Sequence, residues 1–374
     1  MIYALVNNNY QLIDLQHHLV DLRSVDLECT LITVPHTLNQ PDSKMQFSKI
    51  YTFTSPLFHS KSWFTAWLRY YRSAWDVWKT LKPGPKDTLL LYTEFELLNH
   101  LIVHRFHSVG AKIFLIEDGG VATYLPFSTS REERLSAKQW LTTLMVRCLP
   151  HLHRTMFHRA NGIMFPWVKD NTINALCVYR PIDIKRNIPV ILMKCNNRPN
   201  IVPQSGRVIF LNEPIYDYYL EWDKYLTFLG LLLSGLSSGY SEVWFKFHPR
   251  EKTIQRERIK SIIESNHSSI NIIQENESVE NLLDAYRPEA VASFMAATLL
   301  NLDGTGIEPI FLYHLCKDLA DQDLFNQLTR LLSEWEYYFV ESFDELRSGY
   351  QCGWNSRDRP PRGLRINEIV MSNF

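Results

Sequence analysis

The first half of the chain alternates between short apolar runs and longer segments in which apolar residues recur at helical spacing. The runs are apolar almost throughout, as expected of strands that are buried on both faces of a sheet. We predict strands at Met1–Val6, Cys29–Val34, Thr88–Tyr92 and Lys112–Ile116. We predict helices at Gln11–Leu22 and Glu94–His107. Because strands that alternate with helices pair in parallel, the pattern predicts an α/β fold.

The alternation restarts after a stretch of different composition. Residues 196–207 read NNRPNIVPQSGR, and the two prolines, the glycine and the polar side chains indicate a linker. Beyond it we predict strands at Val208–Leu211, Val243–Phe247, Ile270–Ile273, Ala290–Ser293 and Ile310–Tyr313 and helices at Leu220–Ser237 and Glu251–Ser265, with Val279–Ala285 and Ala296–Leu302 continuing the alternation. The sequence therefore predicts two doubly wound, Rossmann-like domains that face a cleft, over 1–200 and 201–374. We expect the last helix to pack back on the first domain.

Composition and charge narrow the classes of function. The 374 residues include 39 Lys and Arg against 40 Asp and Glu, a net charge of -1, whereas a dedicated nucleic-acid binder carries a large basic excess. The six cysteines lie far apart without a CxxC pair, which argues against a disulfide framework or a zinc site. The N-terminus lacks the pattern of a signal peptide, and the most apolar stretch, Tyr225–Leu236, is shorter than the ~20 residues that span a bilayer. We expect a cytoplasmic protein.

The segment 131–160 differs in character from the rest of the chain. It carries six Lys and Arg against two Glu, and these charges are interleaved with Trp, Leu and Met. One interpretation is a basic amphipathic helix that lies on the anionic inner face of the cytoplasmic membrane. The other is a long interdomain helix with a solvated basic face. The sequence leaves both open.

The first candidate for chemistry directly follows a predicted strand. Glu117, Asp118 and Gly119 come after Lys112–Ile116, and ligands of open α/β sheets bind at the carboxyl ends of the strands. Adjacent carboxylates repel each other, which favours the proton-accepting role of a general base. The glycine lets a ligand approach the backbone closely. The alternative is an ordinary turn, in which Asp-Gly pairs are common.

The second candidate is a cationic cluster at the end of another strand. Alternation along Val243–Phe247 places Lys246 and His248 on the same face, and Pro249 ends the strand and can open the next helix. Positive side chains at this place suit a phosphate leaving group, whose charge develops in the transition state. The alternative is a strand end with solvated charges.

Two more candidates follow strands of the second half. Glu275 comes after Ile270–Ile273 and could bind ribose hydroxyls, as acidic residues do in nucleotide-binding folds. Ser293 and Thr298 flank a strand-to-helix junction, where backbone N–H groups and a hydroxyl favour a bound phosphate. The alternatives are plain loop polarity and a helix N-cap at Ser293.

Taken in order, these residues resemble the bacterial sialyltransferases of the glycosyltransferase-B type, namely the lipooligosaccharide sialyltransferases and capsule polysialyltransferases. The shared motifs are Glu-Asp-Gly at 117–119 and His-Pro at 248–249. Lys246 precedes the histidine by two positions, while Glu275 and Ser293 follow it by 27 and 45. The match extends through both domains. It departs at the Ser/Thr element, where relatives carry adjacent hydroxyl residues and here a phenylalanine follows the serine.

The resemblance implies an N-terminal acceptor-binding domain and a C-terminal domain that binds a CMP-sugar. It implies inverting transfer of sialic acid from CMP-sialic acid to a galactose-terminated lipooligosaccharide or capsule glycan, without a metal or other cofactor. Asp118 would take the proton of the acceptor hydroxyl, His248 would protonate or hydrogen-bond the departing phosphate, and Lys246 would add fixed positive charge. The implied catalytic residues are Asp118, His248 and Glu117, and the implied donor-binding residues are Lys246, Pro249, Glu275, Ser293, Thr298 and Gly119.

The sequence leaves several alternatives open. The donor could carry another CMP-activated nonulosonic or Kdo-type acid. A protein of another class is a non-catalytic nucleotide-binding scaffold of polysaccharide assembly, held to the membrane by 131–160. The acceptor, the linkage, the transfer of one sugar or many, and the oligomeric state, a homodimer included, are not determined by the motifs.

Overall fold

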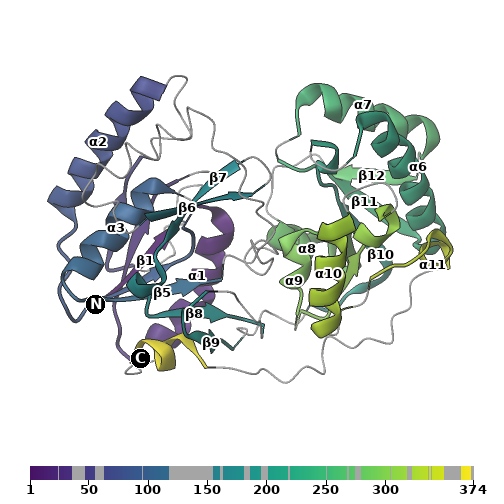
Figure 1. Ribbon diagram of the computed structural model, residues 1–374. Helices are drawn as coiled ribbons and strands as arrows, with labels where there is room; N and C mark the ends of the chain where they lie inside the picture. Colours follow the sequence, from purple (N-terminus) through teal and green to yellow (C-terminus); the bar gives the residue numbers. More distant parts are fainter. Residues whose placement is uncertain are drawn as a thin grey trace. The chain divides into compact units, whose positions relative to one another are not determined.

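A computed structural model of the chain describes residues 1–23, 25–35, 47–54, 63–94, 96–117, 155–160, 163–180, 186–194, 201–217, 220–249, 251–267, 269–273, 279–303, 305–317, 322–335, 337, 339–348 and 364–371. These residues form two compact units (Figure 1). Unit 1 takes those of Met1–Asp118, Pro126–Asn196 and Pro361–Phe374, and unit 2 takes those of Asn197–Pro360. The chain passes from one unit to the other between Asn196 and Asn197, where the predicted linker begins.

Unit 1 is built on a sheet of seven parallel strands in the order β3-β2-β1-β4-β5-β8-β9. The strands are β1 Ile2–Val6, β2 Cys29–Thr33, β3 Lys49–Thr52, β4 Thr88–Leu91, β5 Lys112–Ile116, β8 Ala175–Val178 and β9 Val190–Leu192. Every residue of β1, β2, β4 and β8 is buried, because helices cover both faces of the sheet. The four strands predicted in this half are confirmed, whereas β3, β8 and β9 lie outside the predicted strands.

The helices of unit 1 are α1 Asn9–Arg23, α2 Trp63–Thr80, α3 Leu97–Ser108 and α12 Ile366–Met371. Successive side chains of a strand point to opposite faces, and β1 follows this rule. Its residues Ile2, Ala4 and Val6 belong to the core under α1, whereas the ring of Tyr3 meets Phe106 of α3 edge-on, with centroids 4.9 Å apart. The short helix α12 packs against α1, and its isoleucines join the same core.

A two-stranded hairpin also belongs to unit 1. Its strands β6 Thr155–Ala160 and β7 Ile163–Val168 pair antiparallel. The prediction of a helix over 131–160 is wrong for its last six residues, which form β6; residues 131–154 lie outside the described part of the chain. The overlooked signal is the Asn161-Gly162 pair between two short apolar runs, which is a strong indicator of a two-residue hairpin.

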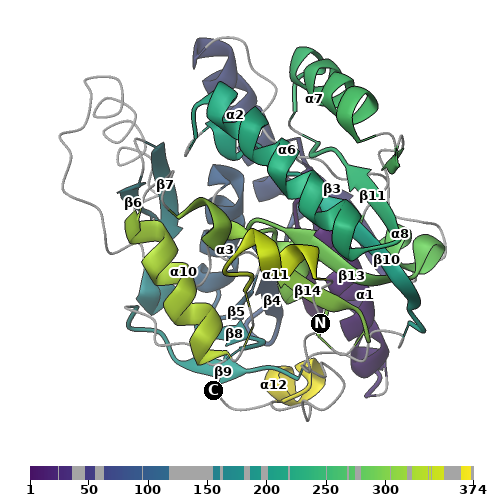
Figure 2. The same cartoon turned by 90° about the vertical axis from the view of Figure 1, so that its right-hand side faces the viewer.

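Unit 2 contains a sheet of five parallel strands in the order β12-β11-β10-β13-β14. The strands are β10 Gln204–Leu211, β11 Glu242–Lys246, β12 Ile270–Ile273, β13 Pro288–Ser293 and β14 Glu308–Phe311. The helices are α6 Trp222–Gly239, α7 Thr253–Asn266, α8 Val279–Tyr286, α9 Ala297–Leu300, α10 Gln322–Glu334 and α11 Phe343–Arg347. The alternation predicted for this half is confirmed, and Figure 2 shows α11 lying across α6, on which it packs.

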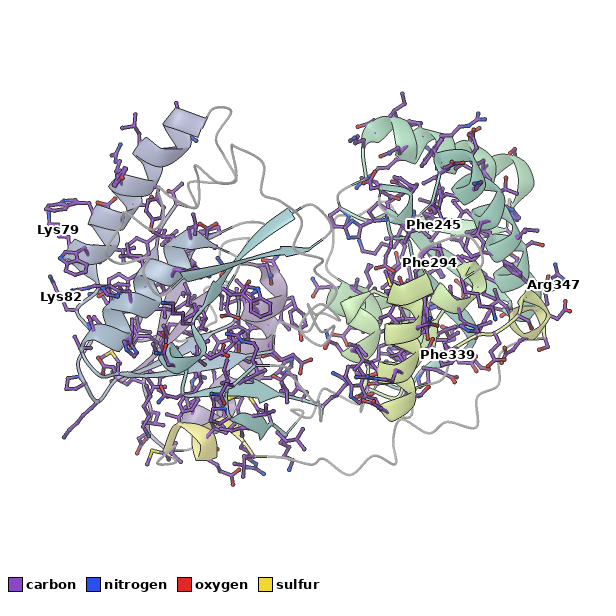
Figure 3. All side chains as sticks on the ribbon, viewed as in Figure 1. Lys79, Lys82, Phe245, Phe294, Phe339 and Arg347 are labelled. Atoms are coloured by element: carbon purple, nitrogen blue, oxygen red, sulfur yellow. The ribbon has the colours of Figure 1, made fainter. Side chains whose placement is uncertain are left out.

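Aromatic side chains hold the centre of unit 2 together. The ring of Phe210 on β10 contacts Phe245 on β11 and Phe294 after β13, with centroids 5.5 and 5.9 Å apart. Figure 3 shows Phe245 and Phe294 inside the unit, between the sheet and its helices. Side chains of this size bury much apolar surface. The ends of three adjacent strands are therefore fixed relative to one another.

The strand order places a topological switch point in unit 2. From β10 the chain moves outward through β11 and β12, and it then returns to the other side of β10 to form β13. The direction in which strands are added therefore reverses between β10 and β13. Nucleotides bind at this position in open α/β sheets. A ligand-binding edge of unit 2 is therefore expected at Leu211 and Ser293.

Candidate active site

Polar side chains follow three neighbouring strands of unit 2. Lys246 ends β11, Asn212 and Glu213 follow β10, and Ser293 ends β13. The main chain connects these ends, because the N–H of Asn212 donates to the carbonyl of Lys246 over 2.9 Å. The parallel sheet thus brings together the ends of strands that are far apart in the sequence; Asn212 and Ser293, for example, are 81 positions apart.

The backbone of His248 is held on both sides by Glu251. The His248 N–H donates to Oε2 of Glu251 over 3.0 Å, and the Glu251 N–H donates back to the His248 carbonyl over 3.1 Å. The guanidinium of Arg256 donates to the same carbonyl over 3.0 Å. His248 itself is half-buried and Pro249 is exposed, whereas Lys246 is only 7% exposed. The backbone of the His-Pro turn is therefore fixed close to the end of β11.

Glu251 is a buried carboxylate under this turn. Its oxygens also accept hydrogen bonds from the side-chain amide of Asn212 and, over 3.4 Å, from the hydroxyl of Tyr216. Burial raises the pKa of Glu251 to about 7, although these hydrogen bonds and Arg256 act in the opposite direction. Glu251 therefore links the end of β10 to the His248 turn through a group that titrates near neutral pH.

A second carboxylate joins β10 to the junction after β13. Oε2 of Glu213 accepts from the Ser293 hydroxyl over 3.0 Å and from the Met295 N–H over 2.6 Å. Burial of the carboxyl group raises the pKa of Glu213, against the hydrogen bonds from this loop. The Ser293 hydroxyl is fully buried and also lies 2.8 Å from the Leu211 carbonyl. The strand-to-helix junction thus presents its donors to a carboxylate of the protein itself.

The remaining predicted residues of unit 2 are placed as follows. Thr298 lies in α9 and is half-buried. Glu275 lies outside the described residues, so its role at the ribose stays a prediction. The donor-binding roles of Lys246, Ser293 and Thr298 also stay predictions. Of the three, Ser293 would have to leave its two acceptors before its hydroxyl could meet a phosphate.

In unit 1, Glu117 follows β5 and is completely buried. Its Oε2 accepts from the Tyr179 N–H over 2.7 Å, and its Oε1 lies 3.5 Å from a guanidinium nitrogen of Arg180. These contacts connect the ends of the neighbouring strands β5 and β8. Asp118 and Gly119 lie outside the described residues. These contacts fix the backbone immediately before Asp118 and turn the Glu117 carboxylate inward. The catalytic roles predicted for Glu117 and Asp118 stay predictions.

A buried polar network continues behind Glu117. The Tyr179 hydroxyl donates to Oδ1 of Asp14 over 2.7 Å, and Nε2 of His18 lies 2.7 Å from the same hydroxyl. Burial raises the pKa of Tyr179 well above its ordinary value, and the Asp14 carboxylate acts in the same direction. This network anchors α1 to the end of β8. It supports the strand end that carries Glu117.

The sequence interpretation missed four residues of this arrangement, namely Asn212, Glu213, Glu251 and Arg180. A usable signal existed for two of them. Asn212 and Glu213 are polar residues directly after the first apolar strand of unit 2, the position that deserved attention in an α/β sheet. Glu251 was assigned to the start of a helix, and nothing in the sequence around Arg180 points to Glu117. The contacts of Glu251 with Asn212, 39 positions away, and of Arg180 with Glu117, 63 positions away, come from the tertiary fold alone.

Within the described ranges, no cluster of three or more His, Cys, Asp or Glu side chains has the geometry to hold a metal ion. Across that same part of the chain, every helix is too short or too polar to cross a bilayer.

Comparison with protein families gives one extended match. The sequence profile of a family described as alpha-2,8-polysialyltransferase (POLYST) matches residues 30–303, which covers most of both units. A search of curated proteins finds no match.

Solved structures resemble the chain over nearly its whole length. A UDP-GlcNAc 2-epimerase from Methanocaldococcus jannaschii is 12% identical, with a TM-score of 0.55 and 99% of each chain covered. A putative UDP-N-acetylglucosamine 2-epimerase from Listeria monocytogenes is 9% identical, with a TM-score of 0.51 over 96% of this chain and 97% of that one. LpCGTa in complex with UDP is 11% identical, with a TM-score of 0.50 over 100% of this chain and 90% of that one. These likenesses confirm the predicted fold class, a pair of Rossmann-like units of the glycosyltransferase-B type.

Proposed function

Since the chain belongs to the alpha-2,8-polysialyltransferase family, we propose that it transfers sialic acid from CMP-sialic acid to a hydroxyl of a bacterial surface glycan. The chain is a glycosyltransferase by that membership, and its donor, acceptor and mechanism are the subject of the proposal. The single observation that carries it is the convergence of Lys246, His248 and the Glu213–Ser293 pair at adjacent strand ends of unit 2.

Unit 2 is assigned the CMP moiety. A cytidine monophosphate carries a negatively charged phosphate that becomes the leaving group, and the switch point of a parallel sheet is the usual place for such a group. Lys246 supplies fixed positive charge there, and the His248 imidazole donates a hydrogen bond or a proton to the departing oxygen. Because Glu251 and Arg256 fix the His248 backbone, the residue that carries the imidazole is held in place without the donor.

Unit 1 is assigned the acceptor and the base. The acceptor oxygen forms a bond to the anomeric carbon of sialic acid while the bond from that carbon to the phosphate oxygen breaks. The proton of the acceptor hydroxyl passes to Asp118, and CMP leaves with the electron pair of the broken bond. Attack from the face opposite the leaving group inverts the anomeric centre. Glu117, held by Arg180 and by the Tyr179 N–H, keeps the end of β5 in place beside Asp118.

The acceptor class follows from the family. A description as an alpha-2,8-polysialyltransferase points to an acceptor that itself ends in sialic acid, and a galactose-terminated glycan is the alternative. Another CMP-activated nonulosonic or Kdo-type acid is the alternative donor. Family membership favours these enzymatic alternatives over the non-catalytic scaffold. No metal takes part in the proposed step, because side chains meet the charge of the phosphate.

The experiment compares the wild type with Asp118→Asn and His248→Ala. Purified proteins receive CMP-sialic acid with sialic acid-terminated and galactose-terminated oligosaccharides, and mass spectrometry identifies the products. Loss of a general base or acid is expected to lower kcat by roughly 10²–10⁴-fold. The matched controls are Asp76→Asn on α2 and His267→Ala after α7, which are expected to retain activity.

The outcomes separate the parts of the proposal. Activity that survives Asp118→Asn removes Asp118 as the base, and the same result for His248→Ala removes the assigned leaving-group role. Abolition of wild-type transfer by excess EDTA would refute the metal-independent mechanism. If correctly folded protein forms no product with either acceptor, this result would contradict the proposed acceptor class.

A further inference from the structure

Helix α2 carries a stripe of exposed apolar side chains. Leu68, Tyr71, Trp75 and Trp78 are 55%, 49%, 69% and 44% exposed. Their spacings of three, four and three residues place them on one face of the helix. Two indole rings and a phenol ring are thus exposed on a single helix face. Contiguous exposed apolar patches are uncommon on soluble proteins and mark interaction sites.

The stripe is not the core-facing side of the helix. A different set of residues, Tyr70, Ser73 and Val77, is buried at 1%, 7% and 0% exposure and faces the rest of unit 1. The Ser73 hydroxyl donates to the Thr54 carbonyl over 3.0 Å, and α2 packs on α3. The helix is therefore already docked through one face, and the four side chains of the aromatic stripe lie beside that face and stay exposed.

Cations lie beside this stripe. Residues 63–86 contain five Lys and Arg and a single acidic residue, Asp76, in a chain whose total net charge is -1. Arg69, Arg72, Lys79 and Lys82 are all exposed. Figure 3 shows Lys79 and Lys82 on the outer side of unit 1, directed away from the sheet.

The edge of the stripe is also stiffened. The guanidinium of Arg105 on α3 lies over the ring of Trp78, 3.9 Å from its centroid, and donates to the Leu81 carbonyl over 3.0 Å. A cation over the face of an indole is a favourable contact. It holds Trp78 in place at the C-terminal end of the stripe, so the surface is pre-formed.

We propose that the exposed face of α2, defined by Leu68, Tyr71, Trp75 and Trp78 with its flanking cations, binds the surface of an anionic phospholipid bilayer. Trp and Tyr favour the boundary between headgroups and acyl chains, and Lys and Arg extend from there to anionic headgroups. A second copy of this face is disfavoured, because a two-fold interface would oppose like charges. α2 is a different segment from 131–160, and the inference does not depend on the proposed reaction.

The test is co-sedimentation of the full chain with extruded vesicles. The vesicles are phosphatidylcholine alone or with phosphatidylglycerol, at low and high salt. We expect binding to the anionic vesicles that weakens as salt screens the charges. Lys79→Glu with Lys82→Glu is expected to lower the partition coefficient at least tenfold, because each cation near an anionic surface contributes about fivefold. Leu68→Ser with Trp75→Ser is expected to lower it by a similar factor.

Matched controls lie on α7 of unit 2. Ile254→Ser removes a side chain that is 78% exposed, and Arg258→Glu with Lys260→Glu reverses two charges. Both are expected to bind vesicles like the wild type. Circular dichroism verifies that every variant is folded. Transfer to a soluble acceptor is expected to be equal in the α2 variants and the wild type, so a failure of the proposed function is recognised separately.

Three results would overturn the inference. The first is no sedimentation of the wild type with anionic vesicles at low salt. The second is equal binding by the α2 variants and the α7 controls. The third is light scattering that shows a dimer in the wild type and a monomer in Leu68→Ser with Trp75→Ser, since this would assign the face to a second copy of the chain.

Discussion

Replacing Glu251 by glutamine tests the electrostatic account of the His248 turn. Glu251 is 6% exposed, and its carboxylate accepts the N–H of His248 over 3.0 Å. Burial raises its pKa to about 7 from an ordinary value of 4.5. A glutamine side chain has nearly the same shape and can accept one of these hydrogen bonds, but it cannot ionise. The substitution therefore isolates the cost of placing a charge at this position.

The sign of the effect follows from proton linkage. Between pH 4.5 and about 7 the folded protein keeps Glu251 protonated while the unfolded chain ionises it, so the folded state binds more protons and stability falls as the pH rises. A rise of the pKa from 4.5 to about 7 corresponds to about 3 kcal/mol, since each tenfold change in the proton equilibrium is about 1.4 kcal/mol. Above pH 7 the contribution is constant. Relative to the wild type, Glu251→Gln is therefore expected to be more stable at pH 8 than at pH 5 by up to this amount.

The assay is urea unfolding of both proteins at pH 5 and at pH 8. Contributions from the other titrating groups cancel in the difference between variant and wild type, because both proteins share them. Glu257→Gln, at an exposed carboxylate of the following helix α7, is the matched control for the loss of one acidic group in this region. A free-energy difference between Glu251→Gln and the wild type that is identical at the two pH values would refute the reasoning.

Two further predictions concern stability. Arg186→Ala should lower the free energy of unfolding in urea by about 3–5 kcal/mol. The substitution removes the guanidinium that lies 2.6 Å from the buried carboxylate of Glu94. A decrease below about 1 kcal/mol, which is typical of surface ion pairs, would contradict a buried ion pair. Gly206→Ala should lower the melting temperature more than Gly110→Ala. Both glycines have φ near +80°, at +76° and +78°, but a Cβ at 206 would collide with the Ser241 side chain whereas nothing lies within 4 Å at 110. An equal fall in melting temperature for the two variants would show that backbone strain at positive φ, and not the contact with Ser241, determines the loss of stability.

Local patterns predicted all five strands of the sheet of unit 2 and four of the seven strands of the sheet of unit 1. Lys112–Ile116 and Ile270–Ile273 form β5 and β12 with the predicted bounds. β5 is recognisable as an apolar run because it is covered on both faces, whereas the edge strand β12 keeps Asn271 exposed. Alternation with helices also predicted the parallel pairing. β3 was missed because three of its four residues are exposed and its sequence, Lys-Ile-Tyr-Thr, is not an apolar run.

The candidate site was only partly predictable. The His-Pro turn and the strand end before Asp118 were found because motifs are contiguous in sequence. Glu213 and Ser293 are 80 positions apart, and Glu117 and Arg180 are 63 apart, so no local pattern indicates that each pair is in contact. The strand order alone brings these ends together. The burial that raises the pKa of Glu213 is likewise a property of the packed unit.

The sequence by itself determined the α/β class, the two successive alternations and the identity of the reactive groups, because these depend on side-chain chemistry and on periodicity over a few residues. Only the tertiary structure decided which carboxylates are desolvated, and which apolar face of α2 is covered. The aromatic residues of α2 lie along one broad side of the helix, which is wider than its contact with α3, so the pattern does not tell which part of that side is covered. Packing against α3 selects Tyr70 and Val77 for the interior and leaves Trp75 in solvent, since each side of a helix can contact only one neighbour.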